Sequence, residues 1–332
     1  MELKKKTIIW EDNNEPPKDY IWVKTDGKAY EYSNVVKNWV ESSFIQADDS
    51  KQKLQVLEEY LNTTIEDYFG ITLDPDLDEK YYKYFTIEAT QDGTTVYFRQ
   101  SNYALDDPLK VEVSTDNGTS WTEVTASLEE DDVPGATIAV LNNGDKVFIR
   151  GKNEAYGFYY APEGDALDNC NFWADKPCYV YGNIMSLVGG DDFARLRKVK
   201  EYAFACFFTD YDETLDWSWM LSKEGEELLL PATTLADYCY YSMFYDCESL
   251  TTAPELPATT LTSGCYNNMF NGCSNLAYIK AMFTTTPGDD YTYNWVNSVK
   301  ATGTFVKNSA ATWNVTGNNG IPSGWTVETA NA

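Results

Sequence analysis

The chain has 332 residues, of which 43% are hydrophobic, so its length allows two or three domains with buried cores. Its formal net charge of −27 disfavours binding to nucleic acid or to anionic membrane surfaces. It contains no histidine, which excludes Ser-His-Asp triads and histidine-based acid–base catalysis.

Residues 1–46 read as an aromatic-rich leader. Ile8-Ile9-Trp10 is too short for the apolar core of a signal peptide, and no run approaches the ~20 apolar residues of a membrane span. We therefore expect neither ordinary export nor membrane insertion. The alternating residues 20–24, the Asp26-Gly27 turn and residues 29–32 predict a β-hairpin.

Residues 47–80 are expected to form a helical stalk and a linker. Apolar spacing predicts a helix over 47–69 that ends at Gly70. Its short heptad run fits a helical contact between identical chains or an ordinary amphipathic helix. The alternating acids that follow resemble the start of an EF-hand loop, but Glu79 stands where that loop requires glycine. We therefore expect an acidic linker there.

Residues 81–160 have the pattern of a β-sandwich. Alternating or apolar runs separated by Asp-Gly and Asn-Gly turns are typical of that architecture. They predict strands at 85–89, 94–98, 111–113, 121–124 and 146–150.

Residues 161–281 are expected to form a repeat region, with clear repeats at 230–255 and 256–281. One pattern recurs after 26 residues, which is typical of a leucine-rich-repeat solenoid. It consists of Leu-Pro-Ala-Thr-Thr-Leu, Cys-Tyr, Met-Phe, Cys and Leu. Residues 202–208 resemble a degenerate copy of this repeat, aligned so that Phe208 would lie over Phe244. We expect residues 282–332 to form a β-rich C-terminal cap.

The seven cysteines are an odd number, which argues against a full disulfide framework. Four of them recur in the repeats, where small buried side chains are a better interpretation than a thiolate metal site. We expect no metal site, no cofactor and no catalytic residue. The acid pairs Asp191/Asp192 and Asp210/Asp212 would be the candidates if the chain cleaved glycans.

Three sequence resemblances accompany these patterns. Residues 114–121 resemble the Asp-box of sialidases, S-x-D-x-G-x-x-W, which is a folding device present here once. Met243-Phe244-x-x-Cys247-x-x-Leu250 and its copy at Met269 resemble BspA-like leucine-rich repeats of Bacteroidales and their phages, over residues 180–332. The leader, with Pro16-Pro17 and the aromatic residues after it, resembles N-terminal attachment segments of phage fibre proteins.

The resemblances imply a structural virion fibre protein, most similar to those of crAss-like phages. Its leader would dock to other virion proteins, and its C-terminal half would bind a host surface glycan or protein. We expect a homotrimer located on the virion and not an enzyme; a bacterial cell-surface adhesin is the alternative, and a glycan-cleaving enzyme is a third. The expected ligand-contact residues are Tyr240, Tyr241, Tyr245, Tyr266, Trp217 and Trp219. The expected docking residues are Trp10, Tyr20, Trp22, Tyr30 and Trp39.

Overall fold

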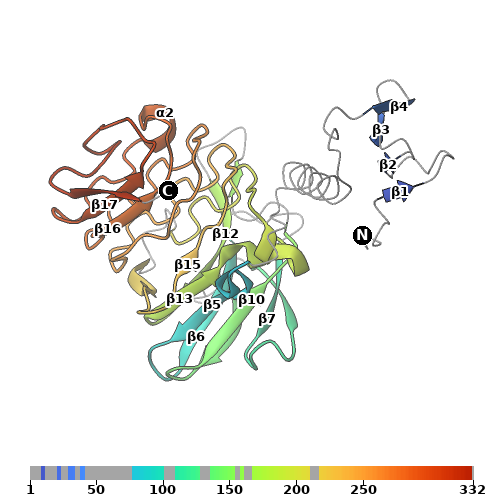
Figure 1. The fold of residues 1–332 in the computed structure, drawn as a ribbon. Helices are drawn as coiled ribbons and strands as arrows, with labels where there is room; N and C mark the ends of the chain where they lie inside the picture. Colours follow the sequence, from blue (N-terminus) through green and yellow to red (C-terminus); the bar gives the residue numbers. More distant parts are fainter. Residues whose placement is uncertain are drawn as a thin grey trace. The chain divides into compact units, whose positions relative to one another are not determined.

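The computed structural model divides into two compact units, Met1–Phe69 and Gly70–Ala332, which are taken separately below (Figure 1). The described part of the chain is mainly β, which confirms that prediction. It comprises residues 9–11, 21–23, 29–33, 38–41, 77–100, 109–127, 135–153, 158–160, 167–209 and 217–330.

The first unit contains one sheet in the order β1-β2-β3-β4. β1 and β2 are parallel, and the other two pairs are antiparallel. Trp22 is opposite Tyr30, so the predicted hairpin is confirmed. The helix expected over 47–69 lies outside the described residues. The strands are β1 (Ile9–Glu11), β2 (Ile21–Val23), β3 (Ala29–Ser33) and β4 (Asn38–Glu41).

The second unit begins with two sheets. The larger has the order β14-β13-β5-β10-β7-β8, with β15 also paired to β13, and the smaller has the order β11-β12-β6-β9. The larger sheet comprises β5 (Phe85–Ala89), β7 (Lys110–Ser114), β8 (Thr122–Thr125), β10 (Lys146–Arg150), β13 (Cys178–Asn183), β14 (Met220–Leu221) and β15 (Leu228–Leu229). The smaller comprises β6 (Thr94–Gln100), β9 (Ala136–Leu141), β11 (Phe158–Tyr160) and β12 (Leu167–Ala174).

The two sheets pack through aromatic side chains. Phe85 of β5 lies 5.7 Å, between ring centroids, from Phe172 of β12, and Phe172 stacks on Phe98 of β6 at 4.9 Å. The five strands predicted from alternation are confirmed as β5, β6, β7, β8 and β10. β12 and β13 also join these sheets, so the sheets extend beyond the expected boundary at residue 160.

Beyond the sheets, four lengths of chain lie one upon another, and we call them the stacked turns: residues 202–208, 238–246, 264–272 and 290–297. Each donates backbone N–H groups to carbonyls of the next. The Tyr240 N–H donates to Cys265 O, and the Tyr266 N–H donates to Tyr291 O. Among the described residues, every backbone hydrogen bond between these turns runs in that direction. A left-handed residue recurs every fourth position, as at Tyr238, Ser242 and Asp246.

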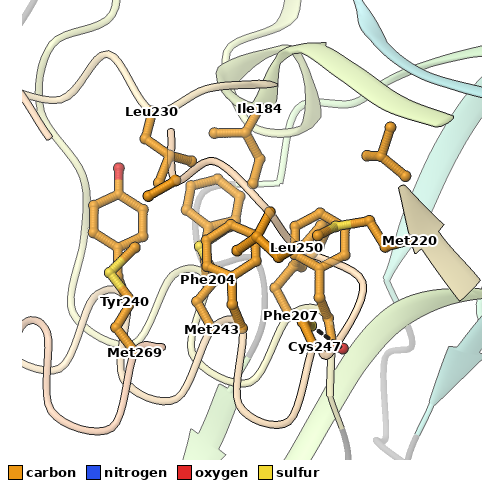
Figure 2. Packing of buried hydrophobic residues seen from close by; sticks show 14 of the residues in the cluster. Ile184, Phe204, Phe207, Met220, Leu230, Tyr240, Met243, Cys247, Leu250 and Met269 are labelled. Atoms are coloured by element: carbon orange, nitrogen blue, oxygen red, sulfur yellow. Dashed lines mark hydrogen bonds between the residues drawn. The ribbon is translucent and has the colours of Figure 1, made fainter. Parts of the chain in front are cut away.

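Equivalent side chains of the stacked turns form buried columns. The rings of Phe208, Phe244, Phe270 and Trp295 follow one another at 5.2, 5.5 and 6.1 Å. The expected register of Phe208 over Phe244 is thereby confirmed. Residues 282–332, expected to be a cap, therefore begin with a turn stacked like those before it. Figure 2 shows part of this core, including Phe204, Tyr240, Met243 and Cys247.

A parallel ladder runs along another side of the same stack. It comprises β16 (Tyr278–Ala281), β17 (Thr304–Asn308) and β18 (Thr326–Ala330), and single bridges join Thr252 and Leu256 to β16. The described helices are short. They are η1 (Glu79–Tyr82), η2 (Ile184–Leu187), η3 (Gly190–Arg195), η4 (Trp217–Trp219) and α2 (Asp289–Thr292).

The sheets and the stacked turns share one hydrophobic core. A single cluster of buried residues extends from Phe85 to Trp325. Phe85 of the sheets contacts Phe207 and Phe208 of the first stacked turn, with ring centroids 5.8 and 6.2 Å apart. The first stacked turn is therefore held by the sheets on one side and by its successor on the other.

Candidate binding surface

Two of the expected contact tyrosines are buried. The side chains of Tyr240 and Tyr266 are 1% and 0% exposed, and their rings stack 6.1 Å apart inside the turns. Their hydroxyls have no hydrogen-bond partner among the described residues. Burial raises the pKa of both phenols well above the ordinary value. The prediction that they contact a ligand is wrong, because positions that recur in register point into the core.

Trp219 is also buried, at 3% exposure, and packs 6.4 Å from the ring of Phe208. The prediction of a ligand contact is therefore wrong for Trp219 as well. Its position two residues after Trp217 suggested an exposed pair, but contact with the first stacked turn turns it inward. Trp217 begins η4, and its side chain lies outside the described residues.

Tyr241 and Tyr245 are half-exposed on the outer side of the second stacked turn. Tyr238 lies beside Tyr241, with ring centroids 6.0 Å apart. Tyr202, from the preceding turn, stacks on Tyr238 at 5.0 Å with only 4° between the ring planes. The structure therefore brings together four tyrosines, which we call the tyrosine patch: Tyr202, Tyr238, Tyr241 and Tyr245.

A glycine makes room for the patch. Gly264 occupies the position after Tyr238 in the stack, and a Cβ added there would collide with the Tyr238 ring. The positive φ of 60° at Gly264 is shared by Tyr238, with a φ of 54° at the equivalent position, so space for the ring and not backbone conformation requires the glycine. The repeat pattern did not indicate Tyr202 and Tyr238, because the equivalent residue of the next turn is Gly264 and tyrosine therefore does not recur there. A glycine 26 residues after Tyr238, leaving its ring uncovered by a side chain, is the signal that would have identified them.

Carboxylates flank the tyrosine patch. Asp237, Asp246 and Glu248 are exposed. Partial burial, and then the charge of Glu248, raises the pKa of Asp246 above its ordinary value. Partial burial also raises the pKa of Tyr245, followed by the charges of Asp246 and Tyr241. The surface thus offers aromatic faces beside hydrogen-bond acceptors, a combination suited to a hydroxyl-bearing ligand and unsuited to an anion.

The expected docking residues belong to the first unit. Backbone register aligns Trp10 of β1, Trp22 of β2 and Tyr30 of β3 in one row across the sheet. Trp39 of β4 is opposite Tyr32 of β3. Tyr20 lies outside the described residues. The structure therefore places three of the five at one level of a small sheet.

The Asp-box forms a closed hairpin between β7 and β8. Both carboxylate oxygens of Asp116 accept hydrogen bonds, from the Ser120 N–H at 2.9 Å and from its hydroxyl at 2.6 Å. The Ser114 hydroxyl donates to the same carboxylate at 2.7 Å, and the indole N–H of Trp121 donates to Gly118 O. The polar side chains of the box hydrogen-bond to one another within the hairpin. We therefore interpret this hairpin as a folding element.

The candidate acids and the described thiols do not cluster into a site. Asp191 and Asp192 are exposed in η3, while Asp210 and Asp212 lie outside the described residues. Within the described ranges no three Cys, Asp or Glu side chains are placed to hold a metal. All seven cysteines are buried, and burial raises the pKa of Cys239 and Cys265 in the stacked turns. No described helix is long and apolar enough to cross a membrane.

Comparison with protein-family models, with curated proteins and with solved structures found no match to this chain.

Proposed function

We propose that this chain is a structural virion fibre protein whose C-terminal region binds the host cell surface, with glycan as the favoured ligand. The observation that carries the binding role is the tyrosine patch. Two tyrosine rings stacked in parallel planes and a third that meets them edge-on form an amphipathic surface beside exposed carboxylates. Tyrosine suits contact surfaces because it offers a large area for little loss of side-chain entropy.

We also propose a finer architecture for the fibre. The two packed sheets would be its β-sandwich, and the stacked turns with their parallel ladder a short leucine-rich-repeat solenoid. Neighbour-to-neighbour hydrogen bonds and recurring buried columns support the solenoid, since each unit buries its apolar face only against the next. Residues 47–69 would form the stalk, and the aromatic first unit would dock to other virion proteins.

A fibre of this design works through many weak contacts. A single tyrosine patch is a small interface, and linked copies gain about 10²–10⁴ in avidity without any new contact. We therefore expect a homotrimer, repeated on the virion. Light scattering of the full-length chain measures this directly, and a monomeric mass would contradict the fibre.

The binding role is tested with the full-length chain carrying Tyr238→Ala together with Tyr241→Ala. Binding is measured to Bacteroidales cells and to their purified capsular polysaccharides. We expect the double variant to lose most of the binding, while Tyr82→Ala, an exposed tyrosine of η1, retains it. Equal binding by the double variant and the wild type would remove the patch from the proposal. Absence of binding by the wild type to every surface would refute the host-attachment role.

A further inference from the structure

A recess separate from the tyrosine patch lies between the sheets and the stacked turns, with a volume of about 590 Å³. We call it the groove; its floor is apolar, and Figure 2 shows three floor residues, Met220, Leu230 and Leu250, within the buried cluster. Its walls come from η1, from the loop between β14 and β15, from residues 250–257 and from β16. This volume lies within the ~300–1,000 Å³ range of small-ligand sites.

The groove exists because the parallel ladder is interrupted there. On one side, Leu228 and Leu229 pair with β13, and on the other, Thr252 pairs with Tyr278. Among the described residues, no backbone hydrogen bond joins residues 228–231 to residues 250–257. Pro231 and Pro254 line the groove, and neither has an N–H with which to bond across it. The opening therefore lies where these two rows are left without backbone hydrogen bonds to one another.

The groove walls carry charges of both signs in pairs. The Lys80 ammonium lies 3.3 Å from Glu227, and Lys280 lies 2.9 Å from Glu255. Such partly exposed pairs are weak, so their donors and acceptors remain open to a ligand. A hydroxyl group both donates and accepts and is satisfied by such a wall. The lining holds three lysines and four glutamates, and this slight negative excess on a strongly acidic chain disfavours an anionic ligand.

The groove also presents flat apolar faces. The half-buried ring of Tyr278 lines it, and this side chain makes no hydrogen bond or ring contact with the described residues. Pro231, Pro254 and Pro257 add saturated rings nearby. The C–H faces of a pyranose pack on surfaces of this kind while its hydroxyls reach the lysine and glutamate heads. An extended peptide would need backbone donors along the edge, which the prolines remove.

We infer that this groove binds a neutral oligosaccharide. This assignment deepens the proposed function, on which it rests, because it names the ligand class and a site separate from the tyrosine patch. Specificity follows from the walls: sialylated and uronate-containing glycans are rejected by charge, and peptides lack their backbone partners.

The test uses the full-length chain on an array of neutral oligosaccharides, acidic oligosaccharides and extended peptides, followed by calorimetry with the best neutral binder. Tyr278→Ala removes the ring, and Thr252→Trp fills the groove from an exposed position while leaving Tyr278 in place. We expect each to weaken binding by about tenfold or more. Tyr293→Ala, an exposed tyrosine outside the groove lining, should bind as the wild type does.

Three outcomes would overturn the assignment: no neutral glycan binds, acidic glycans or peptides bind more tightly, or both groove variants bind unchanged. The same proteins are tested on host cells. If Tyr238→Ala with Tyr241→Ala abolishes cell binding but the groove variants do not affect array or cell binding, the groove assignment fails and host attachment stands. If the wild type binds neutral glycan through the groove but no cell or capsule, host attachment fails and the groove assignment stands.

Discussion

The sheets and the stacked turns bury their cores by different rules. In β10 the buried positions alternate, so Val147 and Ile149 face inward between partly exposed neighbours. In the stacked turns the inside is set by the repeat, and Phe244 lies against Phe270. Contacts in the sheet region join residues far apart along the chain, as when β12 pairs with β6 and Phe85 packs on Phe172. The sheet region therefore depends on long-range closure, whereas each turn depends on its neighbours.

The largest expected effect tests whether the two regions unfold together. Phe85→Ala removes a ring that contacts Phe172 of the sheets and Phe207 and Phe208 of the first turn. We expect a loss of about 4 kcal/mol in the free energy of unfolding, because a large core cavity opens. Denaturant unfolding, followed by tryptophan fluorescence and by circular dichroism, measures it.

Val140→Ala, at an exposed strand position, is the control and should change stability little. A second unfolding transition that keeps its wild-type midpoint in Phe85→Ala would show that the turns are stable without the sheets. The shared core would then not be cooperative.

A smaller effect is expected at the buried carboxylate of β5. Glu88 is 7% exposed and receives the Lys223 ammonium at 2.6 and 2.7 Å and the Tyr181 hydroxyl at 2.7 Å. Glu88→Gln breaks this charged network, so we expect a loss of about 2 kcal/mol at pH 7. Glu255→Gln, in an exposed pair with Lys280, is the matched control and should cost less than about 1 kcal/mol.

The pH dependence of Glu88 provides a second measurement. Burial alone would raise its pKa, but hydrogen bonds from Lys223 and Tyr181 and the charges of Lys223 and Lys146 lower the pKa overall. Its stabilisation is therefore complete above the unfolded-state pKa of about 4.3 and is lost as the pH falls through the lower folded value. Between pH 6 and acid, Glu88→Gln should lose less stability than the wild type does. An identical acid response in both proteins would contradict this.

Within the stacked turns, Gly272→Ala tests the column rule at one position. Gly272 has a φ of 82°, and an added Cβ would collide with the Asp246 carboxylate of the preceding turn. We expect a loss of about 2 kcal/mol from strain and collision. In an Asp246→Gly background the same substitution should cost less, because the colliding group is gone.

Gly317→Ala is the control for backbone strain alone, since φ is 98° there and nothing lies near the added Cβ. It should cost about 1 kcal/mol. If Gly272→Ala costs no more than Gly317→Ala, the collision between neighbouring turns contributes nothing.

The smallest effect is expected in the Asp-box, where every partner is local. Hydrogen bonds from Ser120 and Ser114 lower the pKa of Asp116 to about 2. The stabilisation is present above the unfolded-state pKa of about 3.9 and disappears as the pH falls toward 2. Asp116→Ala should speed amide exchange in the β7–β8 hairpin while leaving the global unfolding midpoint nearly unchanged. Unchanged exchange at the Ser120 amide would contradict this.

The sequence was informative where pattern and partner are local. Alternation located β5 and β10, the Asp-Gly turn located the hairpin of the first unit, and the repeat aligned Phe208 with Phe244. It was uninformative where partners are remote. β12 joins β6 although the strands β7 to β11 lie between them along the chain, and nothing in the pattern of β12 identifies that partner.

The candidate site was predicted only in part for the same reason. Tyr240 and Tyr266 recur in register, which already favoured a structural role for them over Tyr241 and Tyr245, and both are buried in the stack. A side chain is exposed where equivalent positions of neighbouring turns differ, as where the Tyr238 ring is followed by Gly264, which has no side chain to cover it. The groove depends on two rows that do not pair, and only the folded arrangement of residues 228–231 and 250–257 shows this.

The one-way hydrogen bonding of the stacked turns has a consequence for the length of the stack. Each turn offers backbone donors on one face and acceptors on the other. Leu230–Leu235 and Leu256–Leu261 are identical in sequence and begin 26 residues apart. A further 26-residue unit inserted between them would meet acceptors on one side and donors on the other. We therefore expect the stack to accept an added unit while the chain keeps its two ends.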